Sequence, residues 1–516
     1  MFQEKDILQF RKRGVSIDQV MDQLSRFEKG FPSLNVVRAA TINDGILKLG
    51  EQEVQRYVTL FEEKKKGLKL LKFVPASGAA TRMFKDLYEA LNSFSGEEQD
   101  FTAFLEQRNL HSVLNVINHI TEFAFRDDLD MLFRKKGSSL NKMISEGRTR
   151  EIIQAMLISE GLNYGNLPKG LLPFHKVNGK GRTAFEEHLV EGSLYCRQSD
   201  SRVNIHFTVS PEHESGFRNL LDARKELYAS LFDVRFHVHF SRQKLSTDTI
   251  AVDLNNKPFR LENGEILFRP GGHGALLENL NDIEADIIFI KNIDNVAPDR
   301  LKQDTVLYKK ALAGLLTDLS SRINIYLGLL ETESNPSSVL LSEMADFIEH
   351  DLSFILPASF RKMRATDQRN YLLSRMDRPL RVCGMVRNEG EPGGGPFWVA
   401  NSDGSTGLQI AESTQFKMND PHHARVFRSS THFNPVDLVC RIIDHHGNTY
   451  RLHRFRDPET GFISTRSKDG RDVKALELPG LWNGAMAHWN TVFVEVPPTT
   501  FSPVKTITDL LRKEHQ

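Results

Sequence analysis

The apolar positions along this chain follow two spacings, and the change between them predicts the order of helices and strands. Over residues 1–66, apolar side chains recur every three or four positions among Glu, Gln and Lys, which predicts a helical N-terminal region. Residues 67–75, GLKLLKFVP, form a compact apolar run typical of a buried strand, and small residues and the amphipathic segment FKDLYEALNSF follow. Strand, small-residue loop and helix in that order open an α/β unit.

The α/β pattern continues after an interruption. Residues 86–162 have helical spacing and are predicted to be a helical insertion in an α/β core that covers 67–300. Further strands are predicted at 202–210, 233–241 and 286–295. Because these apolar strands are continuous and alternate with helices, they predict a Rossmann-like, mostly parallel sheet covered on both faces.

The rest of the chain divides into two further parts. Residues 301–375 are predicted to be helical, and residues 376–516 mix short strands with loops that contain Gly and Pro, as in a C-terminal α/β part. The predicted fold class is therefore α/β, with a helical N-terminal region and helical insertions.

Composition narrows the class of ligand. Lys and Arg together number 67, as do Asp and Glu, so the net charge is zero and provides no field for a nucleic acid or an anionic membrane. The three cysteines lie far apart and predict neither a disulfide framework nor a zinc site. With no leader-like start and no apolar stretch near the ~20 residues of a membrane span, we expect a cytoplasmic protein. No pattern in the sequence indicates an oligomeric state.

The loop after the first predicted strand is a candidate phosphate site. Ser77, Gly78 and Ala79 are small enough to let the backbone approach a ligand, and the N–H groups of such a loop bind anions. Thr81 and Arg82 follow, and a guanidinium can grip pyrophosphate in bidentate fashion. The alternative is a tight strand-to-helix turn with an exposed Arg. The loop is not a Walker loop, because no Gly-Lys-Ser/Thr closes it.

The segment SGAATRM resembles the Gly-Gly-x-Gly-Thr-Arg-Leu signature of sugar nucleotidyltransferases. Ser77 and Ala80 replace two glycines of that signature, and Met83 replaces its leucine. These departures put the close approach of backbone and phosphate in doubt. The later segment LPKGLLPF resembles the Pro-Lys-x-Leu of the same family and supplies Lys169.

Two further segments, FRPGGHGALLENL and DIIFIKNIDNV, resemble the Pro-Gly-His-Gly and Ser-Asp-Asn segments of eukaryotic-type UDP-sugar pyrophosphorylases. The resemblance implies that His273 and Gly274 shape the nucleotide pocket, although Ala275 stands where many relatives carry an acid. Asp294 follows an apolar run, where a carboxylate can hold Mg²⁺ between phosphates, and Asn292 flanks it. The alternative for Asp294 is a turn former after the strand.

The C-terminal third resembles the same family in three ordered segments, LQIAESTQF, VFRSSTHFNPVDLVCRI and VFVEVPPTTFSPVKTITDLL. They supply Glu412 and Asn434, whose polar groups suit sugar hydroxyls, and Lys505, which precedes a capping-box-like helix start. Pro435 makes the Asn434 match partial, and ordinary surface or turn roles are the alternative for Glu412 and Asn434. The chain also resembles uncharacterised bacterial proteins grouped only as a domain of unknown function.

The resemblance implies a nucleotidyltransferase (GT-A-like) fold and an enzyme that joins a sugar-1-phosphate to a nucleoside triphosphate, UTP favoured, with release of pyrophosphate. Arg82, Lys169 and Lys505 would be catalytic and Asp294 would hold Mg²⁺. One alternative is a nucleotide or nucleotide-sugar binding protein that has lost the chemistry. Another is a transferase that moves a sugar from a nucleotide-sugar. That class usually requires an Asp-x-Asp pair for a metal, and the only such pair in this sequence, Asp128 and Asp130, lies inside the helical insertion.

Overall fold

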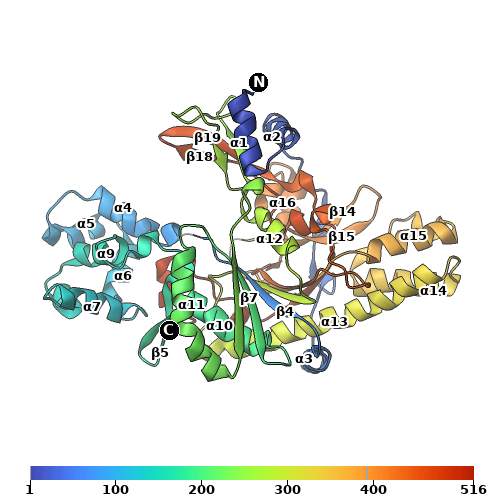
Figure 1. Cartoon of the computed structure of the whole chain (residues 1–516), viewed down its shortest axis with the longest axis horizontal. Helices are drawn as coiled ribbons and strands as arrows, with labels where there is room; N and C mark the ends of the chain where they lie inside the picture. The colour runs from blue at the N-terminus through green and yellow to red at the C-terminus, as the bar shows by residue number, and fades with distance from the viewer. Residues whose placement is uncertain (1, 79, 391–392) are drawn as a thin grey trace. The chain divides into compact units, whose positions relative to one another are not determined.

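The computed structural model describes residues 2–78, 80–390 and 393–516, and these divide into two compact units (Figure 1). Unit 1 comprises Met1–Phe73, Ser241–Ile290 and Leu307–Pro498. Unit 2 comprises Val74–Phe240, Lys291–Val306 and Thr499–Gln516. Each unit therefore assembles segments that lie far apart in the sequence.

Unit 1 is organised around a mixed sheet. Its strands are β2 Thr41–Ile42, β3 Gly45–Leu47, β4 Leu70–Pro75, β11 Ile287–Lys291, β13 Leu380–Arg387, β17 Asp437–Arg441 and β20 Asn490–Glu495. Their order is β2, β3, β20, β13, β17, β11, β4. Most neighbours pair in parallel, but β13 and β17 are antiparallel. The α/β class is confirmed, whereas the sheet is mixed rather than uniformly parallel.

Two smaller sheets complete the strands of unit 1. In the first, the order is β1 Val36–Ala39, β14 Gly395–Ala400, β15 Thr406–Ala411 and β12 Phe354–Ile355. In the second, the order is β10 Phe268–Arg269, β9 Thr249–Val252, β19 Arg471–Glu477 and β18 Phe462–Lys468. The short strand β16 His432–Phe433 pairs with β13.

The N-terminal region differs from the helical prediction over residues 36–47. The helices α1 Glu4–Arg13, α2 Ile17–Lys29 and α3 Glu51–Lys64 form as expected, but β1, β2 and β3 lie between α2 and α3. The reason is tertiary pairing, because β1 lies against β14 and β3 against β20, and such pairing outweighs local spacing.

The remaining helices of unit 1 are mostly those predicted over 301–375. They are α12 Leu277–Asn281, α13 Lys302–Thr332, which begins in unit 2, α14 Ser338–Asp346, α15 Ala365–Met376 and α16 Pro421–Arg428. In Figure 1, α13 is a long helix beside α14, and the hydroxyl of Tyr326 on α13 donates to Glu343 on α14 at 2.8 Å.

Unit 2 is rich in helices. The segment predicted to be a helical insertion contains helices that gather in one group (Figure 1): α4 Lys85–Ser93, α5 Phe101–Gln107, α6 His111–Asn118, α7 Arg126–Lys135, α8 Leu140–Ser145 and α9 Thr149–Leu157. The other elements are β5 Pro173–Val177, β6 Lys180–Thr183, α10 Ala184–Tyr195, β7 Arg202–Thr208, α11 Glu214–Phe232 and β8 Arg235–Ser241. One apolar core joins the insertion to α10, β7 and β8.

None of the helices in the described part of the chain is long and apolar enough to cross a membrane.

Substitution of glycine by alanine is expected to have opposite effects at two positions of α13. A Cβ at Gly314 would lie 1.9 Å from the carbonyl oxygen of Tyr57 on α3, whereas a Cβ at Gly328 would meet nothing within 4 Å. We expect Gly314→Ala to destabilise unit 1 by roughly 1–3 kcal/mol or more through overpacking. Gly328→Ala should instead stabilise it by about 0.5–1 kcal/mol through helix propensity. Urea unfolding measures both, and equal effects would contradict this packing.

Candidate functional site

Four segments of unit 2 that are far apart in the sequence meet around Asp294. The amide of Ile293 donates to the carbonyl of Pro75 at 3.2 Å, and the amide of Val504 donates to the carbonyl of Asp294 at 3.0 Å. The amide of Lys169 donates to the carbonyl of Gly78 at 3.3 Å. The backbone thus ties together the loop after β4, the Pro-Lys segment, the end of β11 and the C-terminal segment, all of which the sequence had singled out.

Two lysines converge on the carboxylate of Asp294. The Nζ of Lys169 lies 2.8 Å from Oδ2 of Asp294, and the Nζ of Lys505 lies 3.8 Å from the same oxygen. Lys169 and Asp294 are nearly buried, whereas 59% of the Lys505 side chain is exposed. Burial alone would raise the pKa of Asp294, but the charges of Lys169 and Lys505 hold this pKa below its ordinary value. Two cations therefore share one anion, with one of them open to solvent.

The loop after β4 combines an exposed part with a buried one. Ser77 and Gly78 are exposed, and so are Thr81 and Arg82 in the 3₁₀ turn Ala80–Arg82. A Cβ at Gly78 would meet nothing within 4 Å, so space is open at this point of the backbone. Ala79 lies outside the described residues.

Ala80, which departs from the glycine of the signature, is fully buried in the apolar core of unit 2. Its amide donates to the carbonyl of Leu167 at 3.1 Å. The extra methyl group is therefore a core contact and does not face the exposed part of the loop.

The turn that follows β11 is held by asparagine. The amide of Asn295 donates to the carbonyl of Asn292 at 3.2 Å, and Oδ1 of Asn295 accepts from the amide of Ser502 at 3.0 Å. The Nδ2 of Asn295 is buried with no hydrogen-bond partner among the described residues. Asn292, predicted to contact a sugar, is half-buried in this turn, next to Asp294.

The C-terminal segment presents Lys505 in a way that the sequence did not predict. The capping box is present, but the helix is only a short 3₁₀ stretch, Ile507–Leu511. The amides of Lys505 and Thr506 both donate to Oδ2 of Asp509, at 2.8 and 2.7 Å. Because Asp509 occupies these N–H groups, the exposed cationic group of this segment is the ammonium of Lys505.

A buried polar network supports the segment around Asp294 and the end of the chain. Oε1 of Glu187, on α10, lies 2.7 Å from Nδ1 of His175, whose Nε2 lies 2.8 Å from Nδ1 of His515. Oε2 of Glu187 accepts from the ammonium of Lys302 at 2.6 Å, and Lys302 also donates to the carbonyl of Ala297 at 2.6 Å. The network therefore anchors the segment that follows Asp294 and the C-terminal residues to one carboxylate.

The charge states in this network follow from burial. Burial would raise the pKa of Glu187, but the hydrogen bond from His175 and the charges of Lys302 and Arg182 lower it. Burial and the neighbouring His175 lower the pKa of His515 to about 3, so His515 is neutral.

The sequence did not point to the residues of this buried network. Their signal was the run EEHLVE in α10, where charged side chains occupy several faces of a fully buried helix.

The predicted nucleotide residues of unit 1 lie against the loop at 478–482. Nδ1 of His273 accepts from the amide of Leu481 at 3.1 Å, and its ring stacks on Trp482 with centroids 4.4 Å apart. Burial lowers the pKa of His273, so the ring is neutral and its proton is on Nε2. A Cβ at Gly274 would lie 2.1 Å from the carbonyl oxygen of Pro479, so this glycine is required by packing.

The predicted sugar residues of unit 1 are engaged within the chain. Oε1 of Glu412 accepts from Nδ2 of Asn483 at 2.7 Å. Nδ2 of Asn434 donates to the carbonyl of Gly384 at 3.0 Å, and its Oδ1 accepts from the amide of Val436 at 3.1 Å. Asn434 thus uses both ends of its amide to shape the backbone.

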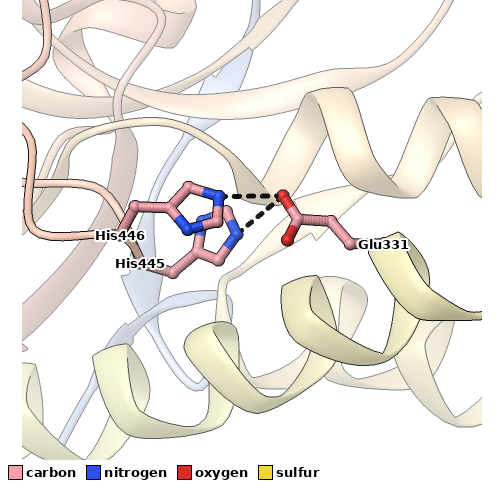
Figure 2. A group of neighbouring side chains, drawn as sticks. All are labelled: Glu331, His445 and His446. Atoms are coloured by element: carbon pink, nitrogen blue, oxygen red, sulfur yellow. Dashed lines mark hydrogen bonds and ion pairs between the residues drawn. The ribbon is translucent and has the colours of Figure 1, made fainter.

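Among the described residues, one group of three His, Cys, Asp or Glu side chains has its ligand atoms within 4.8 Å of one another. Figure 2 shows that Glu331 faces both His445 and His446, whose Nε2 atoms lie 2.8 and 3.1 Å from Oε1 of Glu331. Nδ1 of His445 is buried with no partner in the described chain. A metal on Nε2 would place a proton on that buried atom, so the group is best described as two imidazoles that donate to one carboxylate.

The sequence matches, over residues 3–516, the model of the family described as "Domain of unknown function (DUF4301)". No curated protein matches it. Among solved structures, the UDP-glucose pyrophosphorylase of Leishmania major, known in open and closed structures, is 13% identical with a TM-score of 0.43, over 98% of this chain and 77% of that one. The UDP-glucose phosphorylase of Trypanosoma brucei is 14% identical with a TM-score of 0.44, over 98% of this chain and 77% of that one.

The buried network predicts a pH dependence of stability. The pKa of His515 is about 3 in the folded state, against about 6.5 in an unfolded chain. The unfolded state therefore binds the extra proton first, and the contribution of His515 is complete above about pH 6.5 and falls by roughly 1.4 kcal/mol per pH unit below it. We expect the stability difference between the wild type and His515→Gln, measured by urea unfolding, to shrink in this way from pH 7 to pH 4. A constant difference would contradict the neutral state of His515.

Proposed function

This chain belongs to the DUF4301 family, described as a domain of unknown function, and we propose that it is a sugar-1-phosphate nucleotidyltransferase. The proposed reaction joins a sugar-1-phosphate to a nucleoside triphosphate, UTP favoured, and releases pyrophosphate. One observation carries the proposal: Lys169, Asp294 and Lys505, from three distant segments, form a mixed-charge cluster beside an exposed small-residue loop.

The chemistry of this reaction fits the cluster. In an in-line displacement, a phosphate oxygen of the sugar-1-phosphate forms a bond to the α-phosphorus while the bond to pyrophosphate breaks. Such a step requires charge neutralisation and alignment rather than a protein nucleophile. Lys505 is exposed enough to reach a phosphate, and Lys169 holds the carboxylate in place while donating to the carbonyl of Val504 at 2.6 Å.

Mg²⁺ fits the donor set in one respect. It usually binds through one or two carboxylates together with substrate phosphates and water, and Asp294 offers one nearly buried carboxylate. The ion, when bound there, would neutralise phosphate charge. Binding and orientation of the phosphates would fall to residues of the chain. Arg82 would bind the leaving pyrophosphate, and the backbone of Ser77, Gly78 and Thr81 would lie along the phosphates.

The residues of unit 1 have narrower proposed roles. His273 is neutral with its proton on Nε2, so it would donate a hydrogen bond to the nucleotide. Gly274 and Asn434 would keep the backbone of their loops in place, and Glu412 would accept from a sugar hydroxyl.

A binding protein without turnover is the second candidate, and one observation favours it. Asp294 is already paired with Lys169 and Lys505, so the cluster can hold a phosphate through its lysines alone. This candidate predicts nucleotide binding without release of pyrophosphate.

The test is release of pyrophosphate with Mg²⁺, with four nucleoside triphosphates crossed against a panel of sugar-1-phosphates. We expect turnover with one pair of substrates, reduced by roughly 10²-fold or more in Arg82→Ala and in Lys505→Ala, because each loses a charge on the transferred or leaving phosphates.

Lys85→Ala is the matched control, since Lys85 is exposed in the same unit at the start of α4 and should retain activity. Nucleotide binding without turnover over the whole panel would favour the second candidate. Turnover that survives in Lys505→Ala would contradict the role of that lysine.

A further inference from the structure

Unit 1 contains a large cavity that is lined by none of the residues named for nucleotidyl transfer. Its volume is about 590 Å³, within the range of small-molecule sites. Helix α15, strands β14 and β15 and the loops at 32–35 and 457–460 contribute to its wall. The polar side chains that matter most are Arg375, Arg378, Tyr371, Gln409 and His488.

Arg375 is a buried cation without a hydrogen-bonded counter-charge. Only 5% of the residue is exposed, and its guanidinium stacks on the ring of Phe354 at 3.7 Å. Over residues 2–78, 80–390 and 393–516, no hydrogen bond or ion pair to the guanidinium is present, and its Nε is buried without a partner. A buried guanidinium without hydrogen bonds is costly, because Arg cannot give up its proton.

A second arginine adds to this charge. Arg378 lies three residues further along, just after the end of α15; it donates to the carbonyls of Ser374 and His488 at 2.9 and 3.4 Å and forms no ion pair with the described residues. Burial, together with the charge of Arg378, lowers the pKa of Arg375 well below its ordinary value, although the carboxylate of Asp403 acts in the opposite direction. The wall therefore carries two cations that protein carboxylates do not neutralise directly.

The acids that line the same cavity are occupied elsewhere. Asp403 accepts from the hydroxyl of Tyr371 at 2.8 Å and from Ser405. Asp457 accepts from the amide of Glu459 at 2.9 Å, and the carboxylate of Glu459 pairs with Arg26. Burial lowers the pKa of His488, so this side chain is neutral and adds no charge.

We propose that this cavity binds a small organic anion through Arg375 and Arg378, with a phosphate or carboxylate on a body that carries hydroxyl groups. The two guanidiniums supply the charge-assisted hydrogen bonds that an oxyanion needs. Gln409 suits a hydroxyl group of that body, and the volume suits a metabolite rather than a bare ion. The proposal does not depend on the transferase reaction.

The test is anion binding in a Lys505→Ala background, which removes the exposed cation of the proposed transfer site. Inorganic phosphate and malonate are the two probes, and sodium chloride at equal ionic strength corrects for screening. We expect at least one probe to raise the Tm. Arg375→Met should abolish that rise without lowering the Tm of the anion-free protein, since it removes an unpaired buried charge and retains the contact with Phe354.

Two further variants make the test decisive. Arg378→Gln should weaken anion binding, measured by calorimetry, by roughly tenfold or more. Arg322→Met is the matched control, because Arg322 also stacks on an aromatic ring, Phe347 at 4.3 Å, but is paired with Asp351. It should retain anion binding and lose stability.

The pattern of responses identifies the ligand class. A response to phosphate alone or to malonate alone would support the site and name its anion. No response to either probe, or a response that survives in both Arg375→Met and Arg378→Gln, would overturn the proposal. Because the readout is anion binding, failure of the pyrophosphate assay would leave this result unaffected, and the reverse also holds.

Discussion

The contact between Lys169 and Asp294 is the interaction on which the candidate site depends. Both side chains are nearly buried, and a buried charge is tolerated only when it is paired and hydrogen-bonded. The ammonium of Lys169 bonds to Asp294 and to the carbonyl of Val504, so one cation joins three segments of unit 2. Removing Asp294 would leave the buried ammonium of Lys169 without its counter-charge, whereas removing Lys169 would leave Asp294 paired with Lys505.

Behind this pair, unit 2 uses polar contacts where most cores are apolar. Helix α10 is buried on every side and carries Glu186, Glu187 and Glu191. Each of these carboxylates has partners inside the unit: Glu186 accepts from Tyr228, Glu187 from Lys302, and Glu191 from Lys291. Lys291 and Lys302 stand on either side of Asp294 in the sequence. The helix consequently fixes both ends of the segment that carries Asp294.

The buried cations of unit 1 are not all paired with carboxylates, in contrast to those named above for unit 2. Arg375 has no carboxylate in hydrogen-bond range; its guanidinium stacks on the face of Phe354, and Asp403 is a more distant counter-charge. By contrast, Lys309 on α13 is buried as well but pairs with Asp437. The two buried cations differ in their surroundings, because Arg375 lines the large cavity of unit 1 whereas Lys309 is paired within the fold. This difference is explained if a molecule from outside supplies the missing anion at Arg375.

The sequence by itself determined the α/β class, the strands β4, β7, β8 and β11, and the helical insertion, because these depend on local spacing of apolar residues. It also named Lys169, Asp294 and Lys505. What it could not supply was the pairing of residues 36–47 into strands, the partners of Glu187 or the lack of a partner at Arg375. Those features depend on tertiary contacts, and a side chain's charge state is set by the neighbours that only the tertiary structure provides.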